Sequence, residues 1–336
     1  MKILVTGGTG YIGSHACVEL LNSGYEVVII DNLCNSKREV VDKIKTITGK
    51  EVKFYEEDVC DKTALERIFN ENEIEAVIHF AGLKAVGESV QKPIMYYRNN
   101  LDSTLSLIEV MNDHNCKKIV FSSSATVYGT PKTLPITEDA ALSTTNPYGS
   151  TKLMIEDIFR DLYVADKEWS IALLRYFNPI GAHESGLIGE NPNGIPNNLM
   201  PYIIKVATGE LPILNVFGDD YDTKDGTGVR DYIHVVDLAK GHIKAIERVL
   251  KTQGVDSYNL GTGEGYSVLE LVKTFEKVNN IKVNYQITDR RPGDIATCYA
   301  DPKKAEELLG WKAEKKIEEM CRDSYHFIEV QQKNKE

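Results

Sequence analysis

The sequence predicts an α/β protein with a doubly wound parallel sheet, followed by a smaller α/β domain. Six short apolar runs rich in valine and isoleucine recur with helix-like segments between them, at residues 2–6, 26–31, 52–58, 76–81, 118–124 and 171–177. Hydrophobicity within each run is continuous rather than alternating, which is typical of strands covered on both faces. Helical connections between such strands imply right-handed crossovers and a parallel sheet.

The pattern changes after residue 177. Residues 191–201 and 218–228 are rich in asparagine, glycine, aspartate and proline, which predicts long functional loops. Helices predicted at 237–250 and 268–278 indicate the smaller α/β region. We therefore expect two domains, 1–177 and 178–336, with the chain crossing between them more than once.

Composition limits the function classes. The chain has 336 residues, 42% of them hydrophobic, and a net charge of -11 from 39 Lys and Arg against 50 Asp and Glu. Such a surface attracts neither nucleic acid nor an anionic membrane, and an anionic small substrate would need a local arginine site. The six cysteines show no metal-ligand spacing, and the first apolar run is too short for a signal peptide. We expect a cytoplasmic protein with reduced thiols and no metal.

A glycine-rich turn directly follows the first strand. Gly7, Gly10 and Gly13 lie between that strand and an amphipathic segment, where backbone amides at a helix start can approach a pyrophosphate. The second strand ends at Asp31, 18 residues past Gly13, where a carboxylate binds the adenosine ribose of a dinucleotide in a Rossmann fold. A carboxylate there would repel a 2′-phosphate, so NAD is favoured over NADP, although Lys37 and Arg38 are close in sequence. The alternative is a tight turn without a ligand.

Two further strand ends extend the predicted cofactor site. Asp58 and Val59 lie at the end of the third strand and are expected to contact adenine. The segment 79–89 closes the fourth strand with small residues that would admit the cofactor. His79 inside the fourth strand is interpreted as a packed core histidine rather than a catalyst.

The catalytic prediction rests on Tyr148 and Lys152, which lie four residues apart and so share one face of a helical turn. A phenol has a pKa of about 10. A nearby ammonium group lowers that pKa, which would make Tyr148 a proton acceptor near neutral pH. A serine at the end of the fifth strand, in "SSSATVYG" (122–129), could hold a substrate hydroxyl beside the phenol. Taken alone, the pair could be a surface helix start and the serines a capped strand end.

The glycines, Asp31, the serines and Tyr-x-x-x-Lys follow in the order found in the extended short-chain dehydrogenase/reductase family, which the chain resembles. The motifs "TGGTGYIGSH", "HFAGLKAVGES", "NPYGSTKLM", "RYFNPIGAH", "PNNLMPYI", "DGTGVRDYIHVVDLA" and "RRPGD" are similar to those of its UDP-sugar 4-epimerases over essentially the whole chain.

The resemblance implies reversible C4 epimerisation of UDP-glucose and UDP-galactose through a transient 4-keto sugar and tightly held NAD. It implies catalytic roles for Ser124 and Tyr148 at the sugar 4-hydroxyl and for Lys152 at the nicotinamide ribose. Further residues implied along the cofactor are Gly7, Gly10, Tyr11, Ile12, Gly13, Asp31, Asn32, Asp58, Val59, Phe80, Ala81, Gly82, Lys84, Asn99, Ser122 and Phe177. Those implied for the UDP-sugar are Asn178, Asn198, Leu199, Phe217, Arg230, Tyr232, Arg291, Asp294 and Cys298.

Two other functions share part of this pattern. A nucleotide-sugar 4,6-dehydratase would need an Asp-Glu pair before "VYG", where this chain has Ala125 and Thr126. Neither side chain can usefully exchange a proton at neutral pH. A non-catalytic NAD-binding regulator would be expected to lose the tyrosine or the lysine. Both residues are present, so the pattern favours the epimerase.

Cys298 departs from the strict glucose/galactose epimerases, which resemble one another in having a tyrosine there. The smaller cysteine predicts that UDP-N-acetylglucosamine and UDP-N-acetylgalactosamine are also accepted. Tyr299 is adjacent, and a one-residue shift of this segment could restore the obstruction.

Two apolar stripes have helical spacing. In this family the equivalent helices pair across a two-fold axis, so we expect a homodimer through the helices that follow residues 99 and 148. The stripes are Leu101, Leu105, Ile108 and Met111 on the first helix, and Met154, Ile155, Ile158, Leu162 and Tyr163 on the second.

Overall fold

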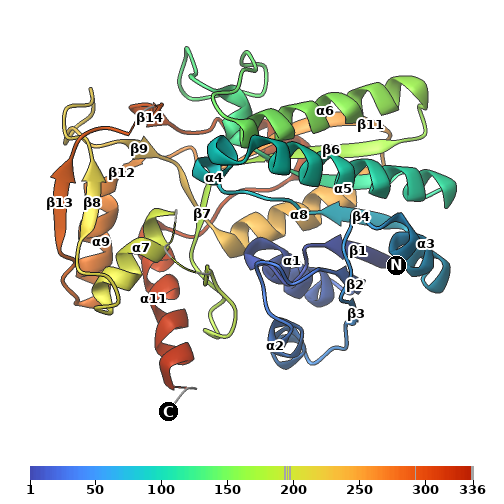
Figure 1. The fold of residues 1–336 in the computed structure, drawn as a ribbon, viewed down its shortest axis with the longest axis horizontal. Helices are drawn as coiled ribbons and strands as arrows, with labels where there is room; N and C mark the ends of the chain where they lie inside the picture. Colours follow the sequence, from blue (N-terminus) through green and yellow to red (C-terminus); the bar gives the residue numbers. More distant parts are fainter. Residues whose placement is uncertain (193, 195, 197, 292, 334–336) are drawn as a thin grey trace.

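The computed structural model describes residues 1–192, 194, 196, 198–291 and 293–333 (Figure 1). Asn193, Ile195 and Asn197 of the predicted loop at 191–201 lie outside the described residues. The main element is a seven-stranded sheet in which every neighbouring pair is parallel. Its spatial order is β11 (Gly254–Leu260), β6 (Ser170–Tyr176), β5 (Lys118–Ser124), β4 (Ala76–His79), β1 (Lys2–Thr6), β2 (Glu26–Ile30) and β3 (Lys53–Tyr55).

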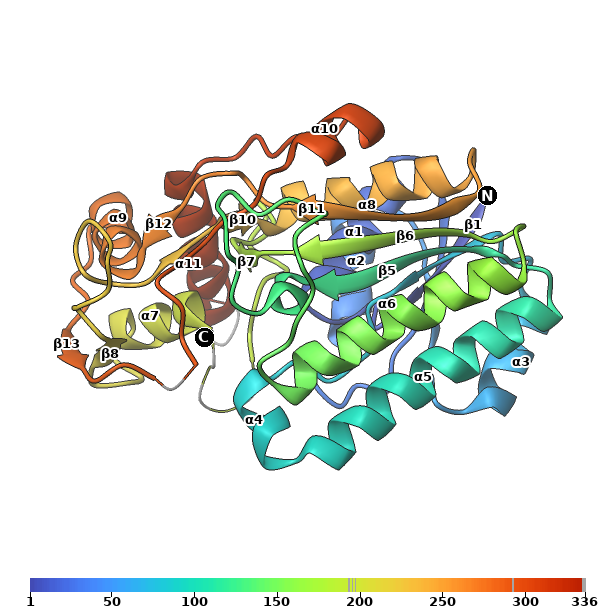
Figure 2. The same cartoon turned by 90° about the horizontal axis from the view of Figure 1, so that it is seen from above.

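Helices cover both faces of this sheet, which confirms the doubly wound prediction (Figure 2). One face carries α1 (Tyr11–Asn22), α2 (Glu39–Thr48), α8 (Val235–Val249) and α10 (Lys303–Leu309). The other carries α3 (Lys62–Glu71), α5 (Pro93–Asp113) and α6 (Pro147–Ala165), and the short α4 (Val86–Gln91) precedes α5. The strands are buried on both faces because their side chains point alternately into two separate apolar cores.

The predicted strands differ from the observed ones mainly at the sheet edges. The third strand is limited to Lys53–Tyr55 rather than 52–58, because this edge strand pairs with only three residues of β2. Strand β11 was not predicted, since its first half is only partly buried and shows no continuous apolar run. Helix α8 packs on α1 and the main sheet, so its assignment to the smaller region was wrong.

A second lobe packs beside the carboxyl ends of the strands (Figure 1). Its core is formed by α7 (Leu199–Ala207), α9 (Val268–Asn279), α11 (Ile317–Lys333) and the pair β8 (Leu214–Phe217) and β13 (Tyr285–Thr288). A small sheet joins β12 (Tyr266–Ser267), β9 (Val229–Arg230) and β14 (Thr297–Cys298), and β7 (Asn178–Ile180) pairs with β10 (Tyr232–His234).

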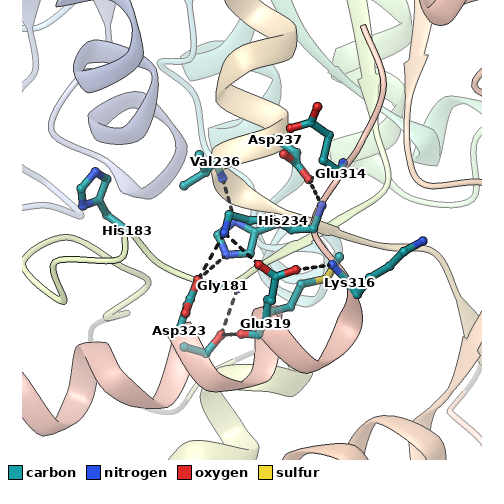
Figure 3. Close-up of polar contacts among 12 residues, drawn as sticks. Gly181, His183, His234, Val236, Asp237, Glu314, Lys316, Glu319 and Asp323 are labelled. Carbon is teal, nitrogen blue, oxygen red and sulfur yellow. Dashed lines mark hydrogen bonds and ion pairs between the residues drawn. The ribbon is translucent and has the colours of Figure 1, made fainter. Parts of the chain in front are cut away.

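The two lobes meet at His234, where β10 leads into α8 (Figure 3). The Nδ1 atom of His234 accepts a hydrogen bond from the Val236 amide, so Nε2 carries the proton and donates to Asp323 of α11 at 3.0 Å. Gly181 has φ 96°, and a Cβ there would lie 2.8 Å from the His234 ring. The Gly181 amide donates to Ser324. These contacts hold α11 against the end of β7.

Within the part of the chain that the structure describes, no helix combines the length and apolar character needed to cross a membrane.

Candidate active site

The candidate site lies at the carboxyl ends of β1, β4 and β5. The strand order reverses between β1 and β4, and in open α/β sheets ligands bind in the crevice at such a switch point. The glycine loop follows β1, residues 80–82 follow β4, and the serines end β5. The fold therefore brings together motifs that are more than a hundred residues apart.

The glycine loop leaves the start of α1 open for an anion. Gly10 is the N-cap of α1 and has no side chain to occupy the first-turn amides. A Cβ on Gly13 would lie 2.2 Å from the Gly7 carbonyl oxygen, so a larger residue would push the helix away from the loop. First-turn amides that no side chain caps and the positive end of a twelve-residue helix form a suitable cradle for a pyrophosphate. This geometry fits NAD.

Asp31 follows β2 and is only 8% exposed. Its carboxylate accepts hydrogen bonds from the Thr9 and Leu33 amides at 3.1 and 3.0 Å and from the Ser36 hydroxyl at 3.1 Å. These bonds fix the carboxylate beside the glycine loop, where a ribose diol can donate to it. Arg38, which had left room for NADP, instead pairs with Glu56 at 3.2 Å and lies over Phe54.

The adenine side of the predicted site is linked across two strand ends. Asn32 donates from Nδ2 to Asp58 at 2.9 Å, and Asp58 also accepts from the Cys60 amide at 2.8 Å. Val59 is buried in the core below them. Asn32 and Asp58 are therefore neighbours, whereas the side chain of Val59 packs in the core.

The loop after β4 is held by a residue that sequence reasoning missed. Asn100 of α5 accepts from the Leu83 amide at 2.7 Å, and its Nδ2 donates to Thr151 of α6 at 3.0 Å. Asn99, the predicted neighbour of the cofactor, donates to Asn100 at 3.0 Å. The signal in the sequence was the pair of asparagines in a helix interior, where asparagine is intrinsically unfavourable.

His79 is buried between two hydroxyl groups, Thr6 at 2.7 Å and Thr104 at 3.0 Å. Burial lowers the pKa of His79 to about 3, so the ring is neutral. Its interpretation as a core residue is confirmed.

Tyr148 and Lys152 both lie on the first turns of α6. Lys152 is buried, and its ammonium donates to the Ser122 carbonyl at 2.6 Å and lies 5.9 Å from the centroid of the Tyr148 ring. Burial lowers the pKa of Lys152 to about 7, against the opposing field of Glu156. Burial also raises the pKa of Tyr148, and a hydrogen bond from Ser124 opposes that rise. The expectation that Lys152 lowers the pKa of Tyr148 is therefore wrong for the protein without cofactor, because burial of the phenol raises that pKa.

Glu156, one turn beyond Lys152, is the centre of a buried network of hydrogen bonds. Its carboxylate accepts from Ser123 at 2.6 Å and makes paired bonds with the buried guanidinium of Arg175 at 3.0 and 2.7 Å. Arg175 also donates to the Tyr128 hydroxyl at 2.9 Å. The network ties β5, β6 and α6 together, and the sequence did not indicate it.

On the substrate side, two predicted arginines converge on one carboxylate. Asp294 lies 3.9 Å from Arg230 and accepts from Arg291 at 3.0 Å. The Arg291 guanidinium lies 4.7 Å from the centroid of the Phe217 ring, which is 36% exposed. These four residues form one partly exposed surface with two positive charges and one negative charge.

The predicted cofactor and substrate surfaces meet at Glu190, another residue that was not predicted. Lys84 lies 3.5 Å from Glu190, and the side chain of Asn198 donates to the same carboxylate oxygen at 2.7 Å. Asn198 is the N-cap of α7 and Leu199 its first residue. One carboxylate thus connects the loop after β4 with the loop before α7.

Phe177 and Cys298 belong to the same small cluster beside the end of β5, which also contains Ala125. Asn178 is exposed at the start of β7. Tyr232 differs from the expectation: its side chain is only 3% exposed and packs in the core of the second lobe, because β10 runs beneath the surface.

Asp231, beside Arg230, was also missed. It is fully buried and accepts hydrogen bonds from Thr262, Gly263 and the Ala300 amide. Its own amide donates to the Cys298 carbonyl at 3.0 Å. Asp231 therefore fixes the strands that carry Arg230 and Cys298.

The chain is similar to known proteins over nearly its whole length, both in sequence and in structure. A family model described as GDP-mannose 4,6 dehydratase matches residues 4–324. UDP-glucose 4-epimerase of Bacillus subtilis (strain 168) is 67% identical over 97% of this chain and 96% of its own. The crystal structure of UDP-glucose 4-epimerase from Bifidobacterium longum with NAD+ and UDP is 60% identical, covers 100% of this chain and 99% of its own, and has a TM-score of 0.95. The Stenotrophomonas maltophila enzyme with NAD and formylated UDP-arabinopyranose is 48% identical, covers 99% of both chains, and has a TM-score of 0.98.

The Rossmann sheet, the glycine loop and the Tyr148–Lys152 pair define a short-chain dehydrogenase/reductase that carries a second lobe. Identity across nearly the full chain makes the assignment narrower. The chain belongs to the UDP-glucose 4-epimerase family.

Proposed function

We propose that this chain catalyses reversible inversion at C4 of UDP-glucose and UDP-galactose, and also of their N-acetylated counterparts. It is an NAD-dependent UDP-sugar 4-epimerase. The observation that carries the catalytic assignment is the convergence of Ser124, Tyr148 and Lys152 at the carboxyl end of β5.

When bound, NAD supplies a hydride acceptor and donor for sugar C4, and its positive nicotinamide favours the phenolate of Tyr148. Tyr148 takes the proton of the 4-hydroxyl and later returns it. Lys152 holds the nicotinamide ribose, and Ser124 holds the sugar oxygen. The amides of Tyr11, Ile12 and Gly13 bind the pyrophosphate, and the carboxylate of Asp31 binds the adenosine ribose. We assign the other predicted cofactor residues to the same site from their motifs.

Arg230 and Arg291 bind the diphosphate by exchanging their contacts with Asp294 for phosphate oxygens, since forked guanidinium bonds match phosphate geometry. Phe217, Asn178, Asn198 and Leu199 complete the UDP site. With UDP fixed and the sugar held only by hydroxyl contacts, the 4-keto sugar can present either face of C4. Inversion follows from that freedom.

Acceptance of N-acetylated sugars rests on Cys298. Its side chain packs in the cluster that contains Phe177, whereas a Cβ on Gly265 would lie 3.5 Å from the Tyr299 ring, which places that ring over Gly265. Successive side chains on an extended segment point to opposite faces. This supports the hypothesis that the residue facing the sugar is the small cysteine, and that Tyr299 does not obstruct it.

The test is an epimerisation assay on purified protein without added NAD, with UDP-galactose and UDP-N-acetylgalactosamine. We expect both to react in the wild type. Cys298→Tyr should lose the N-acetylated substrate and retain UDP-galactose. If the wild type converts UDP-galactose alone, the acceptance of N-acetylated sugars is contradicted and the epimerase activity still stands. If neither substrate reacts even with added NAD, the catalytic roles of Tyr148 and Lys152 are contradicted.

We also propose a homodimer through α5 and α6, but the residues at its interface differ from those of the predicted stripes. Ile108, Met111 and Ile155 of the predicted stripes face the core and are at most 7% exposed. The two helices nevertheless lie side by side on the outer face, where Leu105 is 43% exposed and Met154 44% (Figure 2). These outward side chains support the same two helices as the interface.

A further inference from the structure

Thr126 stands where a dehydratase would have a carboxylate, and the epimerase mechanism above gives it no role. In the structure it lies in the short 3-10 helix η1 (Ala125–Tyr128), directly after the strand that ends in Ser124. The Thr126 amide donates to Ser124 Oγ at 3.2 Å, and the Thr126 hydroxyl donates to the same oxygen at 3.0 Å. One residue thus makes two hydrogen bonds to the proposed catalytic serine.

The number of these bonds restricts what Ser124 can do. A hydroxyl group carries one proton and two acceptor lone pairs. Because Thr126 fills both acceptor positions, Ser124 can interact further only by donating its own proton. In the protein without substrate this proton is donated toward Tyr148, because a hydrogen bond from Ser124 opposes the rise in the pKa of the phenol. With substrate bound, the same proton can be donated to the sugar O4.

Packing holds Thr126 in place. Gly149 follows Tyr148 on α6, and a Cβ on Gly149 would lie 3.2 Å from the Thr126 carbonyl oxygen and 3.4 Å from the Thr126 side chain. The carbonyl also accepts from the Gly129 amide at 3.3 Å. Thr126 is therefore wedged between Ser124 and the start of the helix that carries the phenol.

We propose that Thr126 is a positioning residue that keeps Ser124 a hydrogen-bond donor, so that the proton of the sugar 4-hydroxyl passes directly to Tyr148. In this step the O4–H bond breaks and a phenol O–H bond forms, while Ser124 keeps its proton. The hydride leaves C4 for NAD as in the proposed function, on which this inference rests. A relay in which Ser124 accepts the substrate proton is excluded, because no lone pair is free to receive it.

Substitution of Thr126 does not change the other titratable groups near the Tyr148 phenol. Lys152 lies on the same helix, Tyr176 on β6 and Tyr96 on α5. Burial raises the pKa of both tyrosines far above neutrality, so they remain neutral phenols. A change in the pH profile on substitution of Thr126 therefore reports on Ser124 and Tyr148.

The experiment compares Thr126→Val, which keeps the shape and removes the hydroxyl, with Thr126→Ser, which keeps the hydroxyl. Since one neutral hydrogen bond is lost, we expect T126V to reduce kcat on UDP-galactose about fivefold to tenfold. The acid limb of its pH profile should move to higher pH, because the phenolate loses support. T126S should retain wild-type kcat and profile, and KM should change little in either variant. In a Ser124→Ala background, T126V should have no further effect.

Wild-type kcat and an unshifted acid limb in T126V would overturn the inference. Equal losses in T126S and T126V, or an undiminished effect of T126V in the S124A background, would also overturn it, because Thr126 would then act through packing. Thr126→Ala takes the place of T126V if valine lowers the melting temperature. An inactive wild type would instead refute the proposed function itself.

Discussion

At the scale of single residues, the lowered pKa of Lys152 affects both the chemistry of the site and the stability of the fold. Burial lowers its pKa to about 7 in the folded protein without cofactor, whereas an unfolded chain keeps the proton up to a pKa of about 10.4. Between these values the unfolded state binds more protons, so the free energy of unfolding contributed by this group rises with pH. Below about pH 7 the folded protein bears the full desolvation cost of the buried ammonium.

Lys152→Met should therefore be more stable relative to wild type in acid than in base. We expect its gain in melting temperature, measured on NAD-free protein, to be largest near about pH 6 and to narrow by about pH 9. Epimerase activity should fall, because the nicotinamide ribose loses its ammonium contact. A difference in melting temperature that does not vary with pH would show that Lys152 is not a strained buried cation.

Residue spacing predicted part of this site and missed the rest for a physical reason. Tyr148 and Lys152 share a helix face, so four-residue spacing sufficed to bring them together. Glu190 joins Lys84 and Asn198 from loops about a hundred residues apart, and no local pattern encodes such a contact. The pKa of Tyr148 could not be predicted either, because it depends on how deeply the fold buries the phenol.

At the scale of elements, the strands were predictable where both faces are buried. The runs at β1, β5 and β6 match the observed strands within one residue, since continuous apolar sequence is what a doubly covered strand requires. Edge strands escape this rule, which explains the shortened β3 and the missed β11. Helix α8 has a clear apolar face, but that pattern does not reveal which core the face joins.

The junction between β1 and α1 gives a prediction at this scale. Gly13→Ala would place a Cβ 2.2 Å from the Gly7 oxygen and 2.9 Å from the Gly8 Cα, both backbone atoms that cannot rotate away. The helix start must then move, and its amides leave the pyrophosphate position. We expect lower NAD content after purification, measured from released nucleotide, and a lower melting temperature.

The matched control is Gly87→Ala in α4, where an added Cβ meets no atom within 4 Å. Alanine is intrinsically better than glycine in a helix, so G87A should keep its NAD and match or slightly exceed the wild-type melting temperature. Normal NAD content in G13A would contradict the close packing of loop and helix.

On the scale of the whole molecule, a chain with a net charge of -11 can bind an anionic substrate because two arginines are gathered at one place. Arg230 and Arg291 meet on one face of the second lobe, with Asp294 between them. The motifs indicated each arginine separately. Their shared carboxylate depends on the β9–β14 pairing, which joins residues about seventy apart and is visible only in the folded chain.

The assembly of two copies gives the last prediction. Met154 and Leu105 expose apolar side chains on neighbouring helices, and pairing of these helices with a second copy would remove both from water. Met154→Glu would place a charge in that contact, where burial without a partner is unfavourable. We therefore expect the wild type to sediment as a dimer and M154E as a monomer. Ile287→Glu is the control, because Ile287 is similarly exposed, at 45%, but lies on β13 of the other lobe. A dimer that survives M154E but dissociates in I287E would move the interface to the second lobe, and a monomeric wild type would show that the apolar face of α5 and α6 does not mediate self-association.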